Sequence, residues 1–168
     1  MHDTFMRAAL NEAEKAFIKN EVPVGCVAVK NGKIIARAHN LRETLADPLA
    51  HAEIICMKKA AKKLGGWHLH KVALYTTLEP CLMCAGAIIH ARIKEVYFGA
   101  KDQKSGSSKI LIKNKVKTKK GILQKECGEI IKTFFKNLRR GARAAYSARL
   151  ESVSASNGTV GSNPTLSE

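Results

Sequence analysis

The sequence of 168 residues is within the usual size of one domain and is long enough to bury a hydrophobic core. Apolar residues make up 45% of it and charged residues 26%, which excludes a disordered or fibrous chain. No apolar run approaches the roughly 18 residues that a membrane-spanning helix needs, so we expect no membrane partner.

The charge balance is strongly basic, because 29 Lys and Arg residues oppose 14 acidic residues and give a net charge of +15. This excess favours a polyanionic partner, most commonly nucleic acid, with a surface that only aids solubility as the alternative. The opening segment, MHDTFMRAALNEAEKAF, carries acidic side chains and no unbroken apolar stretch. It fits neither a signal peptide nor a transit peptide, so we expect a cytoplasmic protein.

The N-terminal part of the chain predicts a helix followed by a β-hairpin. Apolar residues recur at helical spacing over residues 4–19, and Asp3 or Thr4 can cap the start of that helix. Two β-branched runs within residues 24–40 then flank Asn31-Gly32. An Asn-Gly pair supplies the positive φ values of a type I′ turn, which is why these runs predict a hairpin.

Two further helices are predicted to begin at prolines. Asp47 can serve as an N-cap and Pro48 as the first helical residue, for a helix that runs to about Lys63. Pro80 begins the second helix, CLMCAGAIIHAR, in the same way. Residues 71–78 and 95–100 predict short strands before and after it, and this alternation indicates an α/β layered domain.

The C-terminal part combines a lysine-rich stretch, an amphipathic helix and a tail. Residues 109–120 contain a predicted strand around residues 115–118, on which alternate lysines would share one face: Lys113, Lys115, Lys117 and Lys119. These lysines fit a protected edge strand at least as well as phosphate contacts. Residues 122–140 predict the last helix, and residues 141–168 a mostly disordered tail, which leaves residues 1–140 as the folded domain.

The cysteines indicate metal binding or catalysis rather than a disulfide framework. The chain has five, an odd number, in a compartment expected to be reducing. Cys81 and Cys84 form a CxxC motif at the start of a predicted helix, where the helix N-terminus would lower the pKa of a thiol. A redox pair is therefore one interpretation of the motif and a metal site is another.

A second motif, His51-Ala52-Glu53, favours the metal interpretation. His51, Cys81 and Cys84 together supply one imidazole and two thiolates, a set that suits Zn²⁺ and leaves a fourth tetrahedral position for water. A closed structural site would need one more ligand, for which five residues are candidates without diagnostic spacing: His39, Cys56, His68, His70 and His90.

Glu53 is the candidate proton shuttle beside such a metal. Bound zinc lowers the pKa of its water toward about 7, and a nearby carboxylate can then move the proton. Residues two apart do not share a helix face, so His51 and Glu53 can converge only near a helix end. The combination of H-x-E with P-C-x-x-C is the signature of zinc nucleobase deaminases.

The sequence resembles the bacterial tRNA-specific adenosine deaminases of the cytidine deaminase superfamily over residues 1–140. The matching segments are EVPVGCVAV (21–29), Asn40, DPLAHAEI (47–54), LEPCLMCAGAIIHARI (78–93), VYFGAKDQKSG (96–106) and parts of 121–135. The resemblance implies a three-layer α/β/α cytidine-deaminase-like fold with a central mixed sheet of about five strands. It also implies a homodimer with one Zn²⁺ per subunit, in which the active site draws on both subunits.

The resemblance further implies hydrolytic deamination of the wobble adenosine in a tRNA anticodon stem-loop, giving inosine and ammonia. His51, Cys81 and Cys84 would bind zinc, and Glu53 would move protons between water, the ring nitrogen and the leaving ammonia. Residues implied to contact the substrate are Asn40, Lys101, Asp102, Lys104, Phe134, Phe135, Arg139 and Arg140.

Other interpretations stay open at this point. Lys101 and Lys104 fit a solvated loop, and at least one of Phe134 and Phe135 is expected in the core. A free-base or nucleoside deaminase acting on guanine or cytosine would use the same zinc chemistry, but a net charge of +15 has no use there. A non-enzymatic zinc RNA-binding module would not need Glu53.

Overall fold

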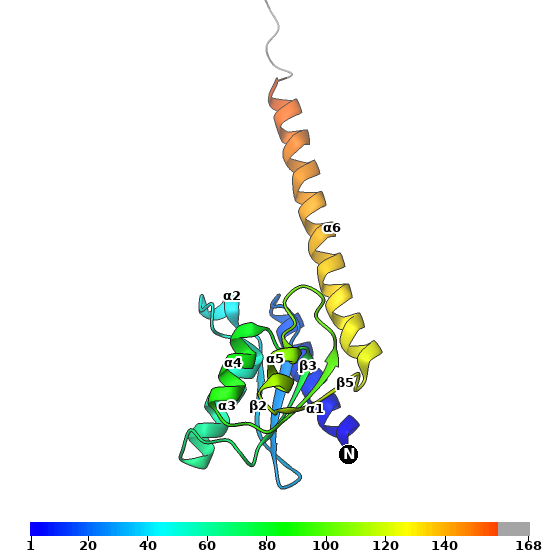
Figure 1. Ribbon diagram of the computed structural model, residues 1–168. Coiled ribbons are helices and arrows are strands. Elements are labelled where there is room, and N and C mark those ends of the chain that lie inside the picture. Colours follow the sequence, from blue (N-terminus) through cyan, green and yellow to red (C-terminus); the bar gives the residue numbers. More distant parts are fainter. Residues whose placement is uncertain (158–168) are drawn as a thin grey trace, which may run out of the picture. The chain divides into compact units, whose positions relative to one another are not determined.

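The computed structural model describes the backbone of residues 1–157 and the side chains of residues 1–143. The chain divides into two compact units, Met1–Phe134 and Phe135–Glu168. The first unit contains a five-stranded sheet in the order β2-β1-β3-β4-β5 (Figure 1). The strands are β1 (Gly25–Lys30), β2 (Lys33–His39), β3 (Ala73–Leu78), β4 (Glu95–Ala100) and β5 (Lys117–Lys120).

The sheet is mixed. β1 pairs antiparallel with both β2 and β3, whereas β3, β4 and β5 run parallel. Parallel neighbours need crossover connections, and α4 and α5 supply them. The helices are α1 (His2–Ile18), α2 (Arg42–Leu45), α3 (Ala52–Leu64), α4 (Leu82–His90), α5 (Ser108–Lys113) and α6 (Gln124–Asn157).

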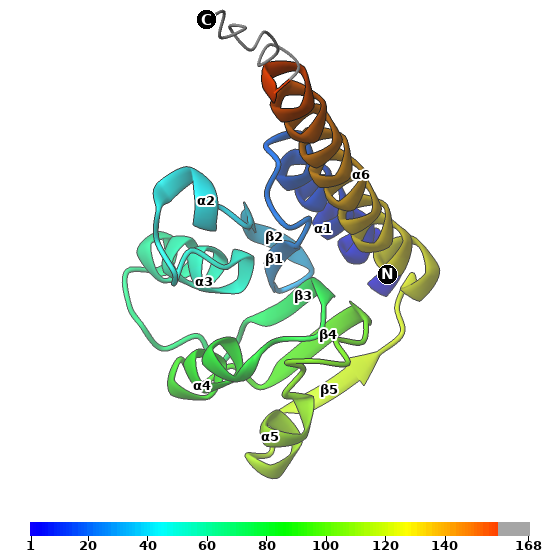
Figure 2. The same ribbon diagram turned by 90° about the horizontal axis from the view of Figure 1, so that it is seen from above.

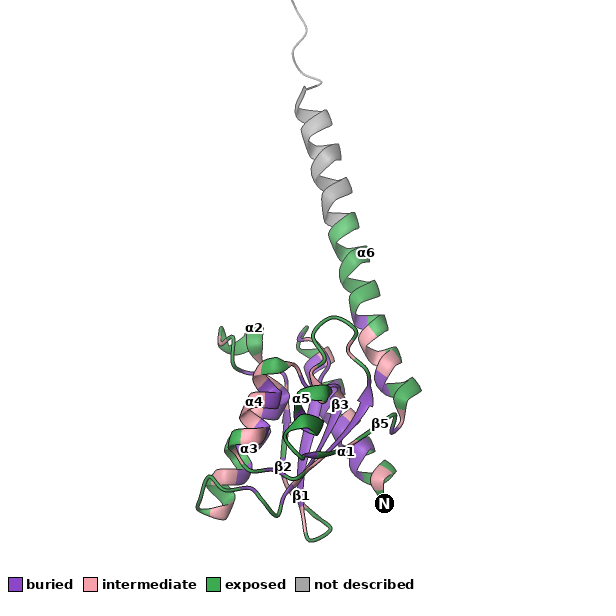
Figure 3. Cartoon of the chain, in the orientation of Figure 1, coloured by how far each residue is buried: buried purple, intermediate pink, exposed green. Residues whose placement is uncertain are grey.

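Helices cover both faces of the sheet and create two hydrophobic cores. One core joins inward residues of β1, β3 and β4 to α3, α4 and α5, with Cys56, Ile88 and Leu111 as examples from the three helices. The other joins the opposite sheet face to α1 and the start of α6, through residues such as Phe5 and Cys127. Figure 2 shows the two helical layers, and Figure 3 shows the buried strands between them. The predicted three-layer α/β/α architecture with a mixed five-stranded sheet is confirmed.

The predicted hairpin is also confirmed. Asn31 and Gly32 connect β1 to β2 with φ values of 51° and 70°, as a type I′ turn requires. At the other end of β1, Gly25 allows α1 to lie directly on the sheet. A Cβ at this position would come within 1.9 Å of the Ala9 carbonyl oxygen and 2.5 Å of the Ala13 nitrogen.

The predicted starts of the two proline helices are wrong by a few residues. The carboxylate of Asp47 accepts the N–H of Leu49 at 2.8 Å, so it closes a local turn, and α3 begins only after His51. Similarly, the Pro80 carbonyl accepts the N–H of Ser107 at 2.9 Å, and α4 begins after Cys81. At Asp47 a local side-chain contact competes with helix initiation, whereas at Pro80 the competing contact comes from a distant segment of the chain.

The lysine-rich stretch was only partly predicted. Residues 108–113 form α5, and Lys115 has a left-handed φ of 60° in the turn that follows. Lys113 and Lys115 therefore do not lie on a strand, and the expected four-lysine face does not exist. Lys117 and Lys119 do lie on β5 and are exposed, and β5 is an edge strand. Their position agrees with edge protection by lysine.

The last helix runs further than predicted, from Gln124 to Asn157 instead of ending near Arg140. The sequence GARAAYSARL continues it, because Ala, Arg and Leu are strong helix formers even without a periodic apolar face. The predicted tail falls partly on this helix, and residues 158–168 lie outside the described part of the chain. Within the described residues, no helix combines the length and apolar character needed to cross a bilayer.

Candidate metal centre and active site

Three side chains that are far apart in sequence converge on one point in the first unit. The ligand atoms of His51, Cys81 and Cys84 all lie within 4.8 Å of one another. Each cysteine Sγ is 3.6 Å from His51 Nδ1. Cys84 is buried, whereas His51 and Cys81 are half-buried. The cluster is therefore open to solvent on one side, as a site that admits a substrate must be.

Two of these side chains occupy the N-cap positions of helices. His51 precedes α3 with φ −71° and ψ 149°, and Cys81 precedes α4 with φ −72° and ψ 174°. Neither residue makes a side-chain capping hydrogen bond. The two helix N-termini thus face the cluster with their positive dipole ends, which favours thiolate ligands. The extended backbone at His51 also explains how residues 51 and 53 converge, because His51 is outside the regular helix.

Glu53 lies in the first turn of α3 and is only 4% exposed. Burial raises its pKa to about 7, and its side chain also contacts Cys84. A carboxyl with that pKa can both accept and donate a proton near neutral pH. The arrangement thus places a proton-transfer group against the cluster of metal-binding side chains.

The side chains of the cluster change one another's pKa values. Hydrogen bonds from Cys84 and then His51 lower the pKa of Cys81 to about 4. The hydrogen bond between His51 and Cys81 raises the pKa of His51. A separate hydrogen bond between Cys84 and Cys81, together with burial, raises the pKa of Cys84. One imidazole and two sulfurs are the donor set that Zn²⁺ prefers, and three protein ligands leave one position open.

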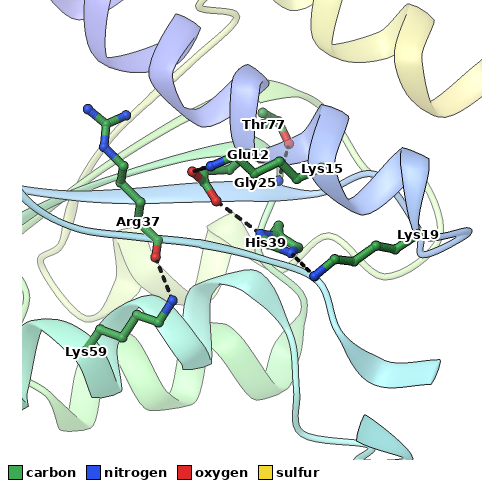
Figure 4. Close-up of polar contacts among 8 residues, drawn as sticks. All are labelled: Glu12, Lys15, Lys19, Gly25, Arg37, His39, Lys59 and Thr77. Carbon is green, nitrogen blue, oxygen red and sulfur yellow. Dashed lines mark hydrogen bonds and ion pairs between the residues drawn. The ribbon is translucent and has the colours of Figure 1, made fainter. Parts of the chain in front are cut away.

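The structure does not support a fourth protein ligand or a disulfide. In the described residues, the metal-competent group consists of His51, Cys81 and Cys84, and none of the five candidates named from the sequence joins it. His39, for example, lies on β2 and its Nδ1 is 3.0 Å from a carboxylate oxygen of Glu12 (Figure 4). All five cysteines are free thiols, so Cys81 and Cys84 are not a disulfide.

Asn40 lies at the end of β2 and is 5% exposed. Its amide nitrogen donates to a carboxylate oxygen of Glu21 at 3.0 Å. Glu21 is fully buried, and sequence reasoning assigned it no role. The only signal for it was its position in the EVPVG segment, directly before the first strand.

The loop after β4 carries Lys101, Asp102 and Lys104. Both lysines are exposed, whereas the Asp102 carboxylate is used within the loop, where it accepts from Lys104 N at 2.9 Å and from the backbone and side chain of Ser105. These N–H donors and the Ser105 hydroxyl outweigh the effect of burial and lower the pKa of Asp102. The structure therefore gives Asp102 a loop-forming contact in addition to any contact with substrate.

A second buried carboxylate that the sequence did not reveal, Glu79, connects this loop to the cluster. Its two oxygens accept the N–H groups of Asp102 at 3.2 Å and Ser108 at 3.1 Å. Gly106 forms an isolated bridge with Cys81, and a Cβ at Gly106 would lie 2.5 Å from the Glu79 carboxylate. The lysine-bearing loop is thus held directly beside Cys81 of the candidate metal site.

The four aromatic and basic residues expected at the last helix divide into two groups. Phe134 is 5% exposed and packs edge-on against Phe17, with ring centroids 5.9 Å apart, so it is a core residue as expected for one of the pair. Phe135, Arg139 and Arg140 belong to the second unit, where their side chains are exposed.

Comparison with known proteins agrees with this geometry. Residues 1–139 match the family described as MafB19-like deaminase. A tRNA-specific adenosine deaminase from Bacillus subtilis (strain 168) is 46% identical over 151 residues, which cover 85% of this chain and 94% of that protein. The class defined by fold and site is thus a deaminase, and the chain belongs to the family of tRNA-specific adenosine deaminases.

Solved structures of two kinds of deaminase also resemble this chain. A structure from a study of A-to-I editing by tRNA:A34 deaminases at the wobble position is 40% identical, with a TM-score of 0.72, and covers 76% of this chain and 98% of that one. A guanine deaminase from Bacillus subtilis is 43% identical with a TM-score of 0.58, and covers 60% of this chain and 65% of that one.

Proposed function

We propose that the protein is a zinc-dependent hydrolase that converts adenosine to inosine at the wobble position of tRNA anticodons and releases ammonia. One observation carries the proposal: His51, Cys81 and Cys84 converge at two helix N-termini beside buried Glu53. The match to tRNA-specific adenosine deaminases over nearly the whole length supports this choice among deaminase reactions.

His51, Cys81 and Cys84 would hold one Zn²⁺ per subunit, and the open coordination position supports a catalytic rather than a structural ion. Zinc bound there supplies a water of lowered pKa as the nucleophile. Glu53 would take one proton from the attacking water and deliver it to the ring nitrogen of the base. It would then carry the second proton of the water to the 6-amino group, whose C–N bond breaks as the C=O bond of the product forms, so that adenosine and water become inosine and ammonia.

RNA recognition in this proposal comes from the side chains around the site. Asn40 hydrogen-bonds the extruded nucleoside, while Lys101 and Lys104 contact the anticodon backbone. Phe134, Phe135, Arg139 and Arg140 complete the anticodon-binding elements, with Phe134 acting through packing of the helix. The net charge of +15 supports a polyanionic substrate.

We also propose a homodimer in the cytoplasm. Exposed apolar side chains in the segments that precede α3 and begin α4 support self-association, namely Leu45, Leu49 and Leu82 at 56%, 52% and 63% exposure. Analytical ultracentrifugation of the full chain tests this directly, and a monomer at micromolar concentration would contradict it.

The substrate assay offers the purified protein anticodon stem-loops with A, C or G at the wobble position, free adenosine, guanine and cytosine. We expect inosine only from the stem-loop with A, and poor turnover of free adenosine because backbone contacts hold the reacting base in place. The similarity to guanine deaminase makes guanine the key competitor. Efficient turnover of guanine or cytosine without RNA activity would overturn the proposal.

Salt dependence tests the electrostatic part of the interface separately. Each neutralised phosphate releases counterions, so the affinity for the stem-loop should fall steeply as salt rises. Double replacement of Lys101 and Lys104 by alanine should reduce that slope, whereas the same change at Lys117 and Lys119 on edge strand β5 serves as a matched control with two lysines lost.

The domain boundary remains our proposal: residues 1–140 form the deaminase domain and residues 141–168 are dispensable. A chain that ends at Arg140 should keep zinc, melting temperature and turnover. A chain that ends at Thr133 also loses buried Phe134, and loss of such a side chain costs about 3–5 kcal/mol. Loss of deamination by the first truncation while the fold survives would make the tail a functional segment.

A further inference from the structure

Glu21 is a fully buried carboxylate between α1 and β1 that no catalytic step uses. It is 0% exposed, and both of its oxygens accept hydrogen bonds. Oε1 accepts the backbone N–H of Thr44, a residue of the short helix α2, at 2.6 Å. Oε2 accepts from the side-chain nitrogen of Asn40 at 3.0 Å. A buried carboxylate destabilises the folded protein when it loses a hydrogen-bond donor, so both donors to Glu21 are needed.

The carboxylate decides which way the Asn40 amide faces. An ionised carboxylate is an acceptor only, so the end of the amide that meets Glu21 must be the NH₂ group. Burial raises the pKa of Glu21, but the backbone N–H donors of the α2 turn, Thr44 first, outweigh this and lower it overall. The amide oxygen and one remaining N–H of Asn40 are therefore directed away from Glu21.

Backbone hydrogen bonds also hold the segment that leads into His51. The Asn40 N–H donates to the Val24 carbonyl at 3.0 Å, and the Leu41 N–H donates to the Ala50 carbonyl at 3.0 Å, directly before His51. Glu21 itself holds the side chain of Asn40 and, through Thr44, the loop of residues 41–50, and both contacts exist in the absence of substrate.

We propose that Glu21 is a positioning residue for deamination, which presents the Asn40 amide in one orientation to the base of the substrate. The proposal rests on the proposed function, in which Asn40 contacts the nucleoside. It assigns Glu21 no contact with substrate or zinc, and its effect on the reaction passes through Asn40.

The protein offers a matched control in Glu12. This carboxylate on α1 is 4% exposed and also binds two partners, Lys15 Nζ at 2.6 Å and His39 Nδ1 at 3.0 Å (Figure 4). Neither partner is Asn40 or part of the 41–50 loop. Glu12→Gln therefore removes the charge of a buried carboxylate in the same region without touching the Asn40 amide.

The test is a double-mutant cycle on kcat/KM for the anticodon stem-loop, with wild type, Glu21→Gln, Asn40→Ala and the double variant. Glutamine keeps the size of the side chain but has only one acceptor oxygen, so its NH₂ group must face one of the two donors. We expect Glu21→Gln to reduce kcat/KM about 10- to 100-fold, the usual effect of losing a charge-assisted hydrogen bond. In the Asn40→Ala background we expect no further loss, because the residue it positions is gone.

Losses that simply multiply in the double variant would overturn the proposal, and so would an equal loss of kcat/KM in Glu12→Gln. Zinc content and melting temperature are measured for all variants, and Asn40→Ser replaces Asn40→Ala if the latter does not fold. An inactive wild type would refute the proposed function instead.

A readout that does not depend on turnover is hydrogen exchange of the Asn40 side-chain amide by NMR. It should be slow in wild type and in Glu12→Gln and fast in Glu21→Gln. Unchanged exchange in Glu21→Gln would show that Glu21 does not hold Asn40.

Discussion

The two faces of the sheet use their covering helices in different ways. On one face, His51 and Cys81 occupy the N-cap positions of α3 and α4, and both belong to the candidate metal site and make no side-chain capping hydrogen bond. On the other face, α1 lies so close to β1 that no Cβ fits at Gly25. On the first face, the N-cap side chains are part of the candidate site and do not cap their helices. On the second face, the helix and the strand pack in direct backbone contact.

β3 shows the same contrast between neighbouring residues. Thr76 shares the α3/α4 face with Leu74, and its buried hydroxyl is the one buried side-chain oxygen or nitrogen in the described residues that has no hydrogen-bond partner. Thr77, next in the chain, accepts the N–H of Gly25 at 3.1 Å (Figure 4). One buried hydroxyl is thus left without a partner on the face that carries the candidate site. Substitutions on each face should therefore affect different properties.

The largest effect is expected from Cys84→Ala on the α4 side of the site. Loss of one of three protein ligands should release the zinc and abolish deamination. Metal analysis of the purified variant checks the first expectation and a turnover assay the second. Full zinc content in Cys84→Ala would remove Cys84 from the ligand set.

Glu53→Gln should separate chemistry from metal binding on the same face. We expect zinc content and stem-loop affinity to be retained while kcat falls by about 10²–10⁴, the usual contribution of a positioned proton-transfer group. Single-turnover kinetics with zinc analysis measure both quantities. Zinc loss, or turnover close to wild type, would contradict the role proposed for Glu53.

Gly25→Ala should affect the other face. The added methyl group would meet backbone atoms of Ala9 and Ala13, which cannot yield as a side-chain end can. We expect the free energy of unfolding to fall by about 3 kcal/mol, measured by urea denaturation. Zinc content per folded molecule should stay at the wild-type value, and zinc loss from folded Gly25→Ala would show that the two faces are coupled.

The smallest and most discriminating comparison is Thr76→Val against Thr77→Val. Removing the unpaired hydroxyl of Thr76 should raise the free energy of unfolding by about 1 kcal/mol, whereas Thr77→Val deprives Gly25 N–H of an acceptor and should lower it by a similar amount. Thermal denaturation of both variants gives the sign of each change. Effects of the same sign would mean that hydrogen-bond satisfaction does not distinguish the two faces.

Much of the fold followed from local sequence signals. Asn31-Gly32 predicted the hairpin, because few residue pairs adopt two successive positive φ values, and the structure has them. Helix starts were less predictable. Asp47 and Pro80 have the residue types of a helix start, but contacts with Leu49 and Ser107 use their polar groups and delay each helix. The short helix α5 was not predicted, whereas the strand expected around residues 115–118 is present as β5 at Lys117–Lys120.

By itself, the sequence indicated the residues of the candidate site and the chemistry proposed for them. The types and spacing of His51, Glu53, Cys81 and Cys84 predicted a metal-binding set and a proton shuttle. This was possible because the side-chain type alone decides which donor atoms a residue offers. Only the tertiary structure decided what holds these residues in place. Glu21 and Glu79 act on partners between 19 and 29 positions away along the chain, and no local pattern encodes such contacts. A buried carboxylate acquires its role from the donors that folding brings to it, and three of these four donors are backbone N–H groups, which do not depend on residue type.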